Sequence, residues 1–366
     1  MEAQYAIIGG GIVGLSVAWG LLKRGIAVIV IDGDDGSYRA SRGNFGLVWV
    51  QSKGMEQPQY GRWSQLSAKL WRGFADDLLA GCGYDVALKQ DGGYDFHHSE
   101  QSLASRVEQY NWLKGQLGGE YPFEVLNQRE LRGEEPEIGP RVVGAILHQQ
   151  DGHANPLKLM RALAADVMRL GGRILTGKHV TTVTHDGHFR IACADGTTVK
   201  AARTVLSAGL GAGDLAPQLG FAAKVYPERG QVLITEKLRP IVHRPSLIVR
   251  QVDEGGIQIG ATNEDVGFDD QVTVEGMSGL AASAIAVYPI LAKAQLVRSW
   301  GALRVLSPDG LPVYQRSKTL PGAFLVTCHS GVTLAAAHAR LLPDWLEGNA
   351  HSPDLKVFSE DRFADA

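Results

Sequence analysis

The stretch Tyr5-Ala6-Ile7-Ile8-Gly9-Gly10-Gly11-Ile12-Val13-Gly14 decides the fold of this chain. An apolar strand leads into a glycine-rich turn with the spacing G-x-G-x-x-G, in which Gly9, Gly11 and Gly14 take the glycine positions. An apolar helix follows, and then a second buried strand at 27–31 ends at Asp32. This order of strand, turn, helix, strand and acid predicts a Rossmann-type domain that binds a dinucleotide.

Each residue of the motif has a physical reason. Gly9 permits the tight turn, Gly11 lets a pyrophosphate approach the backbone, and Gly14 lets the helix pack against the strand. The N-terminus of the helix offers unpaired N–H groups and a positive dipole end to phosphates. The carboxylate of Asp32 can accept hydrogen bonds from the ribose hydroxyls of a dinucleotide. The alternative is a glycine turn that binds nothing.

Composition limits the class of protein. A chain of 366 residues suits two domains, and 45% hydrophobic with 20% charged residues is typical of a soluble globular protein. The net charge of −3 gives no reason to expect nucleic acid or an anionic membrane surface. We expect no transmembrane segment, because no apolar run is long enough, and no signal peptide, because Met1 precedes the first strand by only a few residues.

The cysteines indicate the compartment. Cys82, Cys193 and Cys328 are far apart and form no C-x-x-C pair. We therefore expect no disulfide framework and no metal site, and a cytoplasmic location.

The middle of the chain reads as a second structural unit. Short strands separated by glycines are expected between residues 226 and 300, with one helix near 275–286, and they predict an antiparallel sheet. Residues 130–140 are expected to form a surface loop. A helix is expected to place Trp63, Leu66, Leu70 and Phe74 on one face.

The C-terminal end repeats the N-terminal pattern. A buried strand at 323–327, a turn at 328–331 and a helix at 332–346 are expected there. Strand, turn and helix at both ends predict that the termini meet in one nucleotide domain. The second domain would then be inserted between them.

Several motifs occur in order and carry a family resemblance. They are Gly9 to Gly14, Ser41 to Leu47, Ser207-Ala208-Gly209, Gly301 to Arg304 with Pro308 to Pro312, and Ser330 to Leu334. With them the whole chain resembles the FAD-dependent amine oxidoreductases of the D-amino-acid oxidase and glycine oxidase superfamily. It is most similar to the FAD (beta) subunits of heteromeric opine oxidases or dehydrogenases, which act on octopine or nopaline. Hydroxyproline dehydrogenase and hydrogen cyanide synthase subunits are also similar.

The resemblance implies an α/β fold with a discontinuous Rossmann-type FAD-binding domain and an inserted substrate domain on a mixed or antiparallel β-sheet. The FAD-binding domain is expected at residues 1–90, 150–220 and 300–366. The substrate domain is expected at 91–149 and 221–299.

The resemblance also implies how FAD is bound. The segment from Ser41 to Leu47 would run along the pyrophosphate and under the flavin, and the backbone of Val180 would face adenine. The turn at Ser330 would place a helix N-terminus at the flavin N1–C2=O edge. A plain surface loop and a plain helix cap are the alternatives. The expected FAD contacts are Gly9, Gly11, Ile12, Gly14, Asp32, Gly33, Ser41, Arg42, Gly43, Asn44, Phe45, Gly46, Leu47, Val180, Ala208, Gly209, Arg304, Ser330, Gly331, Val332 and Thr333.

Arg304 matches the family arginine that holds the substrate carboxylate, for which a guanidinium suits bidentate pairing. Val305 stands where the family usually has proline, and an ordinary ion pair is the alternative for Arg304. His329 is a candidate catalytic base, although a histidine in such a turn is more often structural. Arg250 and Tyr226 are further candidates for substrate contact.

The resemblance implies oxidation of a carbon that bears a secondary amine, with hydride transfer to flavin N5. Electrons would pass to partner subunits that carry FMN or an iron–sulfur centre, because this chain lacks a cysteine cluster for one. A self-sufficient D-amino-acid, glycine or sarcosine-type oxidase that makes peroxide is an alternative. D-Hydroxyproline dehydrogenase and a non-catalytic FAD-binding subunit remain further alternatives, and the glycine motif alone would also fit a nicotinamide enzyme.

Overall fold

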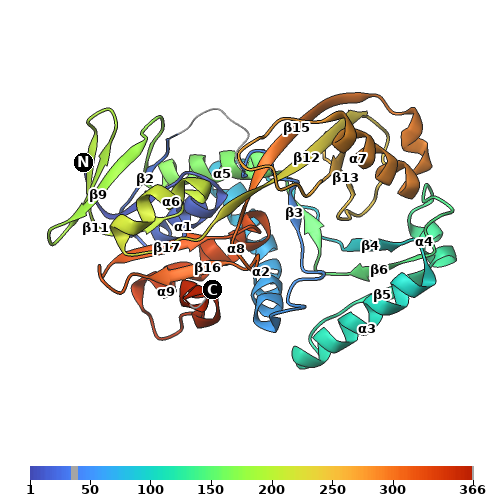
Figure 1. Cartoon of the computed structure of the whole chain (residues 1–366), viewed down its shortest axis with the longest axis horizontal. Coiled ribbons are helices and arrows are strands. Elements are labelled where there is room, and N and C mark those ends of the chain that lie inside the picture. Colours follow the sequence, from blue (N-terminus) through green and yellow to red (C-terminus); the bar gives the residue numbers. More distant parts are fainter. Residues whose placement is uncertain (34–39, 365–366) are drawn as a thin grey trace.

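The computed structural model describes residues 1–33 and 40–364. Its largest sheet contains β1 (Glu2–Ile8), β2 (Val28–Ile31), β8 (Arg173–Leu175), β9 (Val180–His185), β10 (Phe189–Cys193), β11 (Thr198–Leu206), β16 (Val313–Arg316) and β17 (Ala323–Thr327). The main path of the sheet has the order β16-β17-β11-β1-β2-β8, and β10 and β9 extend it from β11 (Figure 1). β1 pairs in parallel with β11 and β2, so the N-terminal strand is central, as a Rossmann-type domain requires.

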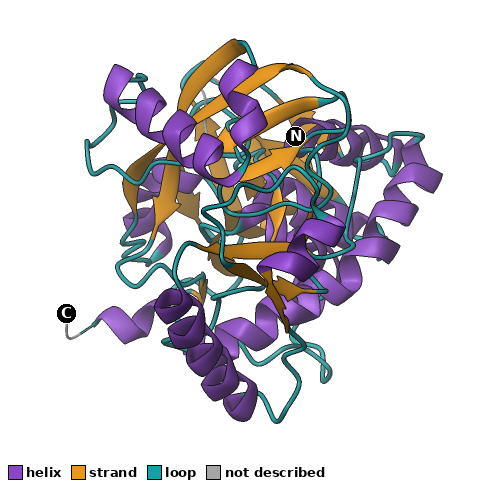
Figure 2. Cartoon of the chain, turned by 90° about the vertical axis from the view of Figure 1, so that its right-hand side faces the viewer, coloured by secondary structure: helices purple, strands orange, loops and turns teal. Residues whose placement is uncertain are grey.

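Helices cover this sheet, which explains why its central strands are apolar on both faces. Tyr5 and Ile7 of β1 face one hydrophobic core, whereas Ala6 and Ile8 face another. Figure 2 shows strands in the interior with helices around them. Among the helices that contribute to the first core are α1 (Ile12–Leu22), α2 (Pro58–Cys82), α5 (Pro156–Arg169), α8 (Gly331–Arg340) and α9 (Leu342–Glu347).

The two ends of the chain meet, as predicted. β17 and β1 lie on either side of β11, and both pair with it in parallel. The helices that follow these two strands, α1 and α8, pack against each other. The site-bearing turns after β1 and β17 are therefore neighbours although more than 300 residues separate them in the sequence.

Two further sheets form the other half of the molecule, on the right in Figure 1. A four-stranded antiparallel sheet has the order β13-β14-β12-β15, and a three-stranded one has the order β4-β6-β5. A parallel bridge between Tyr94 and Ser246 connects them, so the arrangement is mixed. The strands are β4 (Gly93–His97), β5 (Glu124–Asn127), β6 (Gly144–His148), β12 (Tyr226–Lys237), β13 (Val249–Gln251), β14 (Gly256–Gly260) and β15 (Leu296–Leu306).

Helix α7 (Val274–Val287) packs on the four-stranded sheet, while α3 (Glu100–Gln116) and α4 (Gln128–Glu134) lie beside the three-stranded one. A small ladder of β3 (Leu47–Val48) with β7 (Gly152–His153) lies between the halves (Figure 1). β15 runs across the expected boundary at residue 300, and the division of the chain into domains stays a prediction.

Three local expectations are wrong. The expected loop at 130–140 begins as α4, which Asn127 and Glu130 start with a capping box. The expected single helix at 332–346 is two helices, because Pro343 has no N–H for the helical hydrogen bond and its ring crowds the preceding turn. Leu66 of α2 is 41% exposed, so it does not share the buried face of Trp63 and Phe74. None of the helices within the described residues is long and apolar enough to cross a membrane.

Candidate functional site

The turn between β1 and α1 has no room for side chains at two glycines. Gly9 has a φ of 114°, and a Cβ atom there would lie 2.4 Å from the carbonyl oxygen of Ser207. A Cβ at Gly14 would lie 2.0 Å from the carbonyl oxygen of Gly9. The predicted roles of tight turn and close helix packing therefore agree with the geometry at both positions.

The N-terminus of α1 is open to a ligand. Gly11 occupies the N-cap and provides no side-chain hydrogen bond to the first turn. The Ser41 hydroxyl accepts from the Ile12 N–H at 3.0 Å, and the Asp32 carboxylate accepts from the Gly10 N–H at 3.0 Å. Ser41 and Asp32 thus lie beside the N-terminus of α1, where free N–H groups and the positive end of the helix dipole favour the binding of phosphates.

Gly33 and Val180 lie at the same end of the sheet. The backbone N–H of Lys178 donates to the carbonyl of Asp32 at 2.9 Å, and Gly33 faces the ring of His179. Val180 follows directly at the start of β9 and is buried. Ala208 and Gly209 come after β11, where the Ser207 N–H donates to the Ile8 carbonyl at 2.8 Å. Arg42 is exposed.

The segment from Gly43 to Leu47 bridges the two halves of the molecule. The Trp300 indole N–H donates to the Gly43 carbonyl at 3.2 Å, which attaches the segment to β15. The Asn44 side chain accepts from the Gly46 N–H at 2.7 Å and forms the turn. Gly46 has a φ of 88°, and a Cβ there would lie 2.5 Å from the Ala154 carbonyl beyond β7.

Arg250 is buried against Phe45 of this segment and does not face an open space. Its guanidinium is 2% exposed and lies 5.7 Å from the centre of the Phe45 ring. It donates to Gln258 at 2.9 Å and to the Ala154 carbonyl at 3.3 Å, and burial lowers its pKa to about 9. Tyr226, at the start of β12, is 43% exposed.

The N-terminus of α8 lies beside that of α1. A Cβ atom added at Gly331 would lie 3.5 Å from the Val13 side chain, while Val332 and Thr333 complete the first turn. The Thr333 hydroxyl accepts from the Trp49 N–H at 3.1 Å and donates to the Leu47 carbonyl at 3.2 Å. These two hydrogen bonds attach the segment around residues 47–49 to the first turn of α8.

Arg304 points across β12 toward an acid. The register of β12 and β15 places Glu228 opposite Arg304, and the Nη1 atom of Arg304 donates to Oε1 of Glu228 at 2.8 Å. Burial lowers the pKa of the guanidinium, and Glu228 opposes this effect. The Arg304 side chain keeps 18% exposure.

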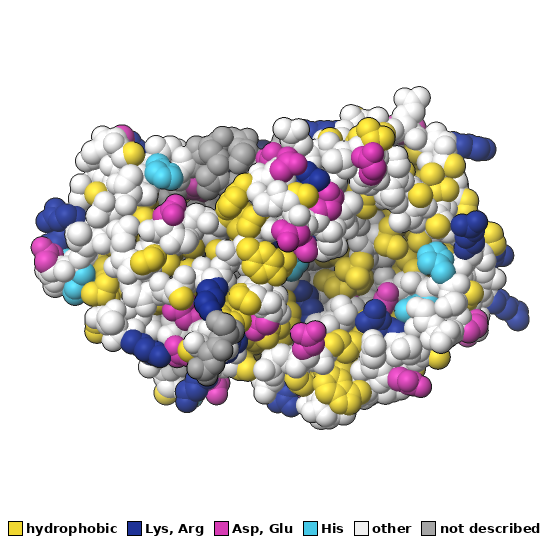
Figure 3. Space-filling view, in the orientation of Figure 1, with side chains coloured by type: hydrophobic (Ala, Val, Ile, Leu, Met, Phe, Trp, Pro, Cys, Tyr) yellow, Lys and Arg dark blue, Asp and Glu magenta, His cyan; other side chains and the backbone are white. Residues whose placement is uncertain are grey.

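His329 has accessible surface, yet surrounding protein lowers the pKa of its imidazole to about 3 by burial, and Lys53 and Arg304 lower it further. Figure 3 shows a hollow right of the centre, where hydrophobic and basic side chains come together.

A whole-chain match decides the family. The model for DAO, FAD dependent oxidoreductase, matches residues 4–345. The chain belongs to this family.

Two curated relatives and one solved structure agree with this DAO-family membership. The chain is 41% identical over 367 residues to a subunit of the opine oxidase of Rhizobium meliloti, covering 99% of this chain and 98% of the relative. It is 40% identical over 363 residues to the corresponding subunit of the opine oxidase of Agrobacterium tumefaciens, with 99% and 98% covered. The crystal structure of glycine oxidase from Geobacillus kaustophilus superimposes with a TM-score of 0.91 at 24% identity, covering 98% of both chains. This DAO-family protein is an FAD-dependent amine oxidoreductase.

The geometry fits FAD. The open end of α1, the glycines that admit a close ligand, and Asp32 at the end of β2 are what an adenine dinucleotide requires. The Ser330 hydroxyl does not cap α8 either. Neither N-cap residue, Gly11 of α1 or Ser330 of α8, therefore provides a side-chain hydrogen bond to the first turn of its helix.

Sequence reasoning missed Lys53 and Tyr60. The Lys53 ammonium donates to the Tyr60 hydroxyl at 3.1 Å and to the Ser330 hydroxyl, while the two hydroxyls are 2.7 Å apart. This places a cation at the N-terminus of α8. No motif marks Lys53, because its place depends on the packing of α2 against α8.

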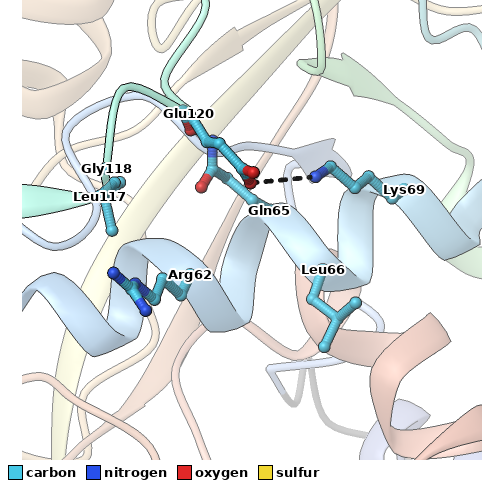
Figure 4. Close-up of a pocket in the computed structure, with 7 residues that line it drawn as sticks. All are labelled: Arg62, Gln65, Leu66, Lys69, Leu117, Gly118 and Glu120. Atoms are coloured by element: carbon cyan, nitrogen blue, oxygen red, sulfur yellow. Dashed lines mark hydrogen bonds and ion pairs between the residues drawn. The ribbon is translucent and has the colours of Figure 1, made fainter. Parts of the chain in front are cut away.

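A separate surface pocket lies away from this flavin site. It is lined by residues of α2 and of the turn after α3, including Arg62, Leu66 and Gly118 (Figure 4). The Lys69 ammonium lies 3.9 Å from the Glu120 carboxylate at its edge. None of the predicted site residues of this DAO-family chain lines it.

Proposed function

We propose that this chain is the FAD-carrying subunit of an opine oxidase or dehydrogenase that cleaves the C–N bond of a secondary-amine amino acid. The observation that supports this most is the 41% identity to a subunit of an opine oxidase, which extends over 99% of the chain. The substrate would be an opine such as octopine or nopaline.

FAD supplies the two-electron acceptor when it is bound. Arg304 would bind the substrate carboxylate and orient the C–H bond, since its guanidinium is close enough to the His329 imidazole to help lower the pKa of that ring. The N-terminus of α8 and the Lys53 ammonium add positive potential at this place, which favours negative charge that develops there. The neutral amine would lose a hydride from carbon and a proton from nitrogen. Water then converts the imine into an amino acid and a 2-oxo acid.

The electron acceptor is proposed to be a partner subunit with FMN or an iron–sulfur centre. The word subunit in the names of two relatives motivates this, and Cys82, Cys193 and Cys328 are three separate free thiols. A self-sufficient oxidase is the second candidate, which the glycine oxidase relative from Geobacillus kaustophilus at 25% identity favours.

The experiment uses the purified, yellow chain with octopine, nopaline, glycine, sarcosine and D-hydroxyproline. Anaerobic bleaching at 450 nm by an opine, followed by dye reduction without peroxide, is expected. Fast oxygen uptake with peroxide would favour the oxidase, and bleaching only by hydroxyproline would favour that dehydrogenase. A preparation that no amine bleaches would overturn the proposal.

We expect His329 to take no proton during turnover. Because the pKa of its imidazole is lowered to about 3, the ring stays neutral from pH 5 to 9. His329→Asn should therefore keep the pH profile of kcat/KM, whose rise with pH would come from the substrate amine losing its proton. Steady-state rates with octopine between pH 5.5 and 9.5 test this. Loss of the ascending limb in the variant would make His329 the base after all.

A further inference from the structure

Glu228 occupies an unusual position for a carboxylate. Its Oε1 atom accepts a hydrogen bond from Nη1 of Arg304 at 2.8 Å. The proposed function assigns this same guanidinium to the substrate carboxylate. The Asn263 amide donates to the same Glu228 oxygen at 2.7 Å and helps to fix it. Both members of the pair remain partly accessible, at 18% for Arg304 and 23% for Glu228.

The other acids nearby are already neutralised. Glu264 binds the buried Arg229 at 2.5 Å and also accepts from Gln231 at 2.7 Å. Asp269 binds Arg229 from the other side at 2.6 Å. The negative charge of Glu228, by contrast, would be less well neutralised whenever Arg304 donates its hydrogen bonds to a bound anion.

A substrate carboxylate on Arg304 would therefore meet a second carboxylate at the same guanidinium. Like charges this close repel, and partial burial weakens the screening by water. A substrate that brings a cation to Glu228 removes this repulsion and gains a charge-assisted hydrogen bond. A substrate with an apolar side chain keeps the repulsion.

We propose that Glu228 is a specificity-determining residue that binds a guanidinium or ammonium group of the substrate. The inference rests on the proposed function and narrows it. The preferred substrates are opines that carry a cationic side chain, as those derived from arginine do, over opines of apolar amino acids. Arg304 would bind the negative carboxylate of the substrate, and Glu228 would bind its positive side-chain group.

The test compares octopine with its counterpart in which norvaline replaces arginine, using the holoenzyme and an artificial dye. Glu228→Gln should raise the KM for octopine about 10- to 100-fold, the loss expected for one hydrogen bond to a charged group. The KM for the norvaline compound should stay the same or fall. Glu236→Gln is the matched control, because Glu236 lies on the same strand about 27 Å farther along.

A second measurement does not depend on turnover. Calorimetric Kd values for arginine and norvaline should differ for the native protein and converge in Glu228→Gln. Should this variant fail to fold, Glu228→Asp keeps the charge and should keep the preference for arginine.

Three results would count against the inference. Equal KM changes for both opines would mean that Glu228 only holds Arg304 in place. An unchanged ratio of kcat/KM values would refute a role in specificity, as would a native enzyme that prefers the norvaline compound; the proposed function survives all three. Oxidation of neither opine would instead overturn the proposed function itself, and this inference with it.

Discussion

A Gly14→Ala variant should purify with little or no FAD. The added methyl group would lie 2.0 Å from the Gly9 carbonyl oxygen and 2.6 Å from the Ser207 hydroxyl, so α1 must move away from β1. The N–H groups that face the pyrophosphate move with the helix. Overpacking of this kind costs about 1–3 kcal/mol, which corresponds to FAD binding that is about 5- to 150-fold weaker.

The ratio of absorbance at 450 and 280 nm measures this, followed by titration of the apoprotein with FAD. Gly73→Ala is the matched control, since Gly73 also lies in a helix but has nothing within 4 Å of an added Cβ. This control should keep its FAD and gain about 1 kcal/mol of stability from helix propensity. Full FAD content at native affinity in Gly14→Ala would show that the dinucleotide does not bind at this turn.

Arg304→Gln should raise the KM for an opine about 100- to 1000-fold while FAD stays bound. The variant loses the hydrogen bonds to the substrate carboxylate, and it leaves Glu228 uncompensated beside that carboxylate. Adding Glu228→Gln to this variant should lower the KM part of the way back, because the repulsion disappears while the missing attraction does not return.

The measurements are steady-state KM and flavin content, with thermal unfolding as a check on folding. Arg239→Gln serves as the matched control, because Arg239 forms an exposed ion pair with Glu137 on the surface. Native kinetics in Arg304→Gln would remove Arg304 from the substrate site and leave it as half of a structural ion pair.

The sequence predicted those parts of the fold that depend on neighbours in the chain. The glycine turn and the buried strand before it follow from local residue types. The start of α5 is equally local, because the Asn155 side chain accepts from the N–H groups of Leu157 and Lys158 and caps the helix. The resemblance then predicted that both ends of the chain belong to one discontinuous FAD-binding domain.

What the sequence did not predict depends on distant partners. Glu228 and Arg304 meet because of the register between β12 and β15, 76 residues apart, which no local pattern records. Lys53 reaches Ser330 across 277 residues for the same reason. The buried position of Arg250 likewise depends on its contacts with His153 of β7 and with the Phe45 ring, which no local pattern records, and its contact with substrate stays a prediction.

The position of α8 has a consequence for biosynthesis. One side of the proposed cofactor site begins at Gly331, the first residue of α8, and the preceding strand β17 pairs with β11. A nascent chain on the ribosome would therefore contain the N-terminus of α1 long before the N-terminus of α8 emerges. We therefore expect stable capture of the vitamin-derived cofactor only after α8 has been translated, and translation products that stop before residue 331 should accumulate without colour.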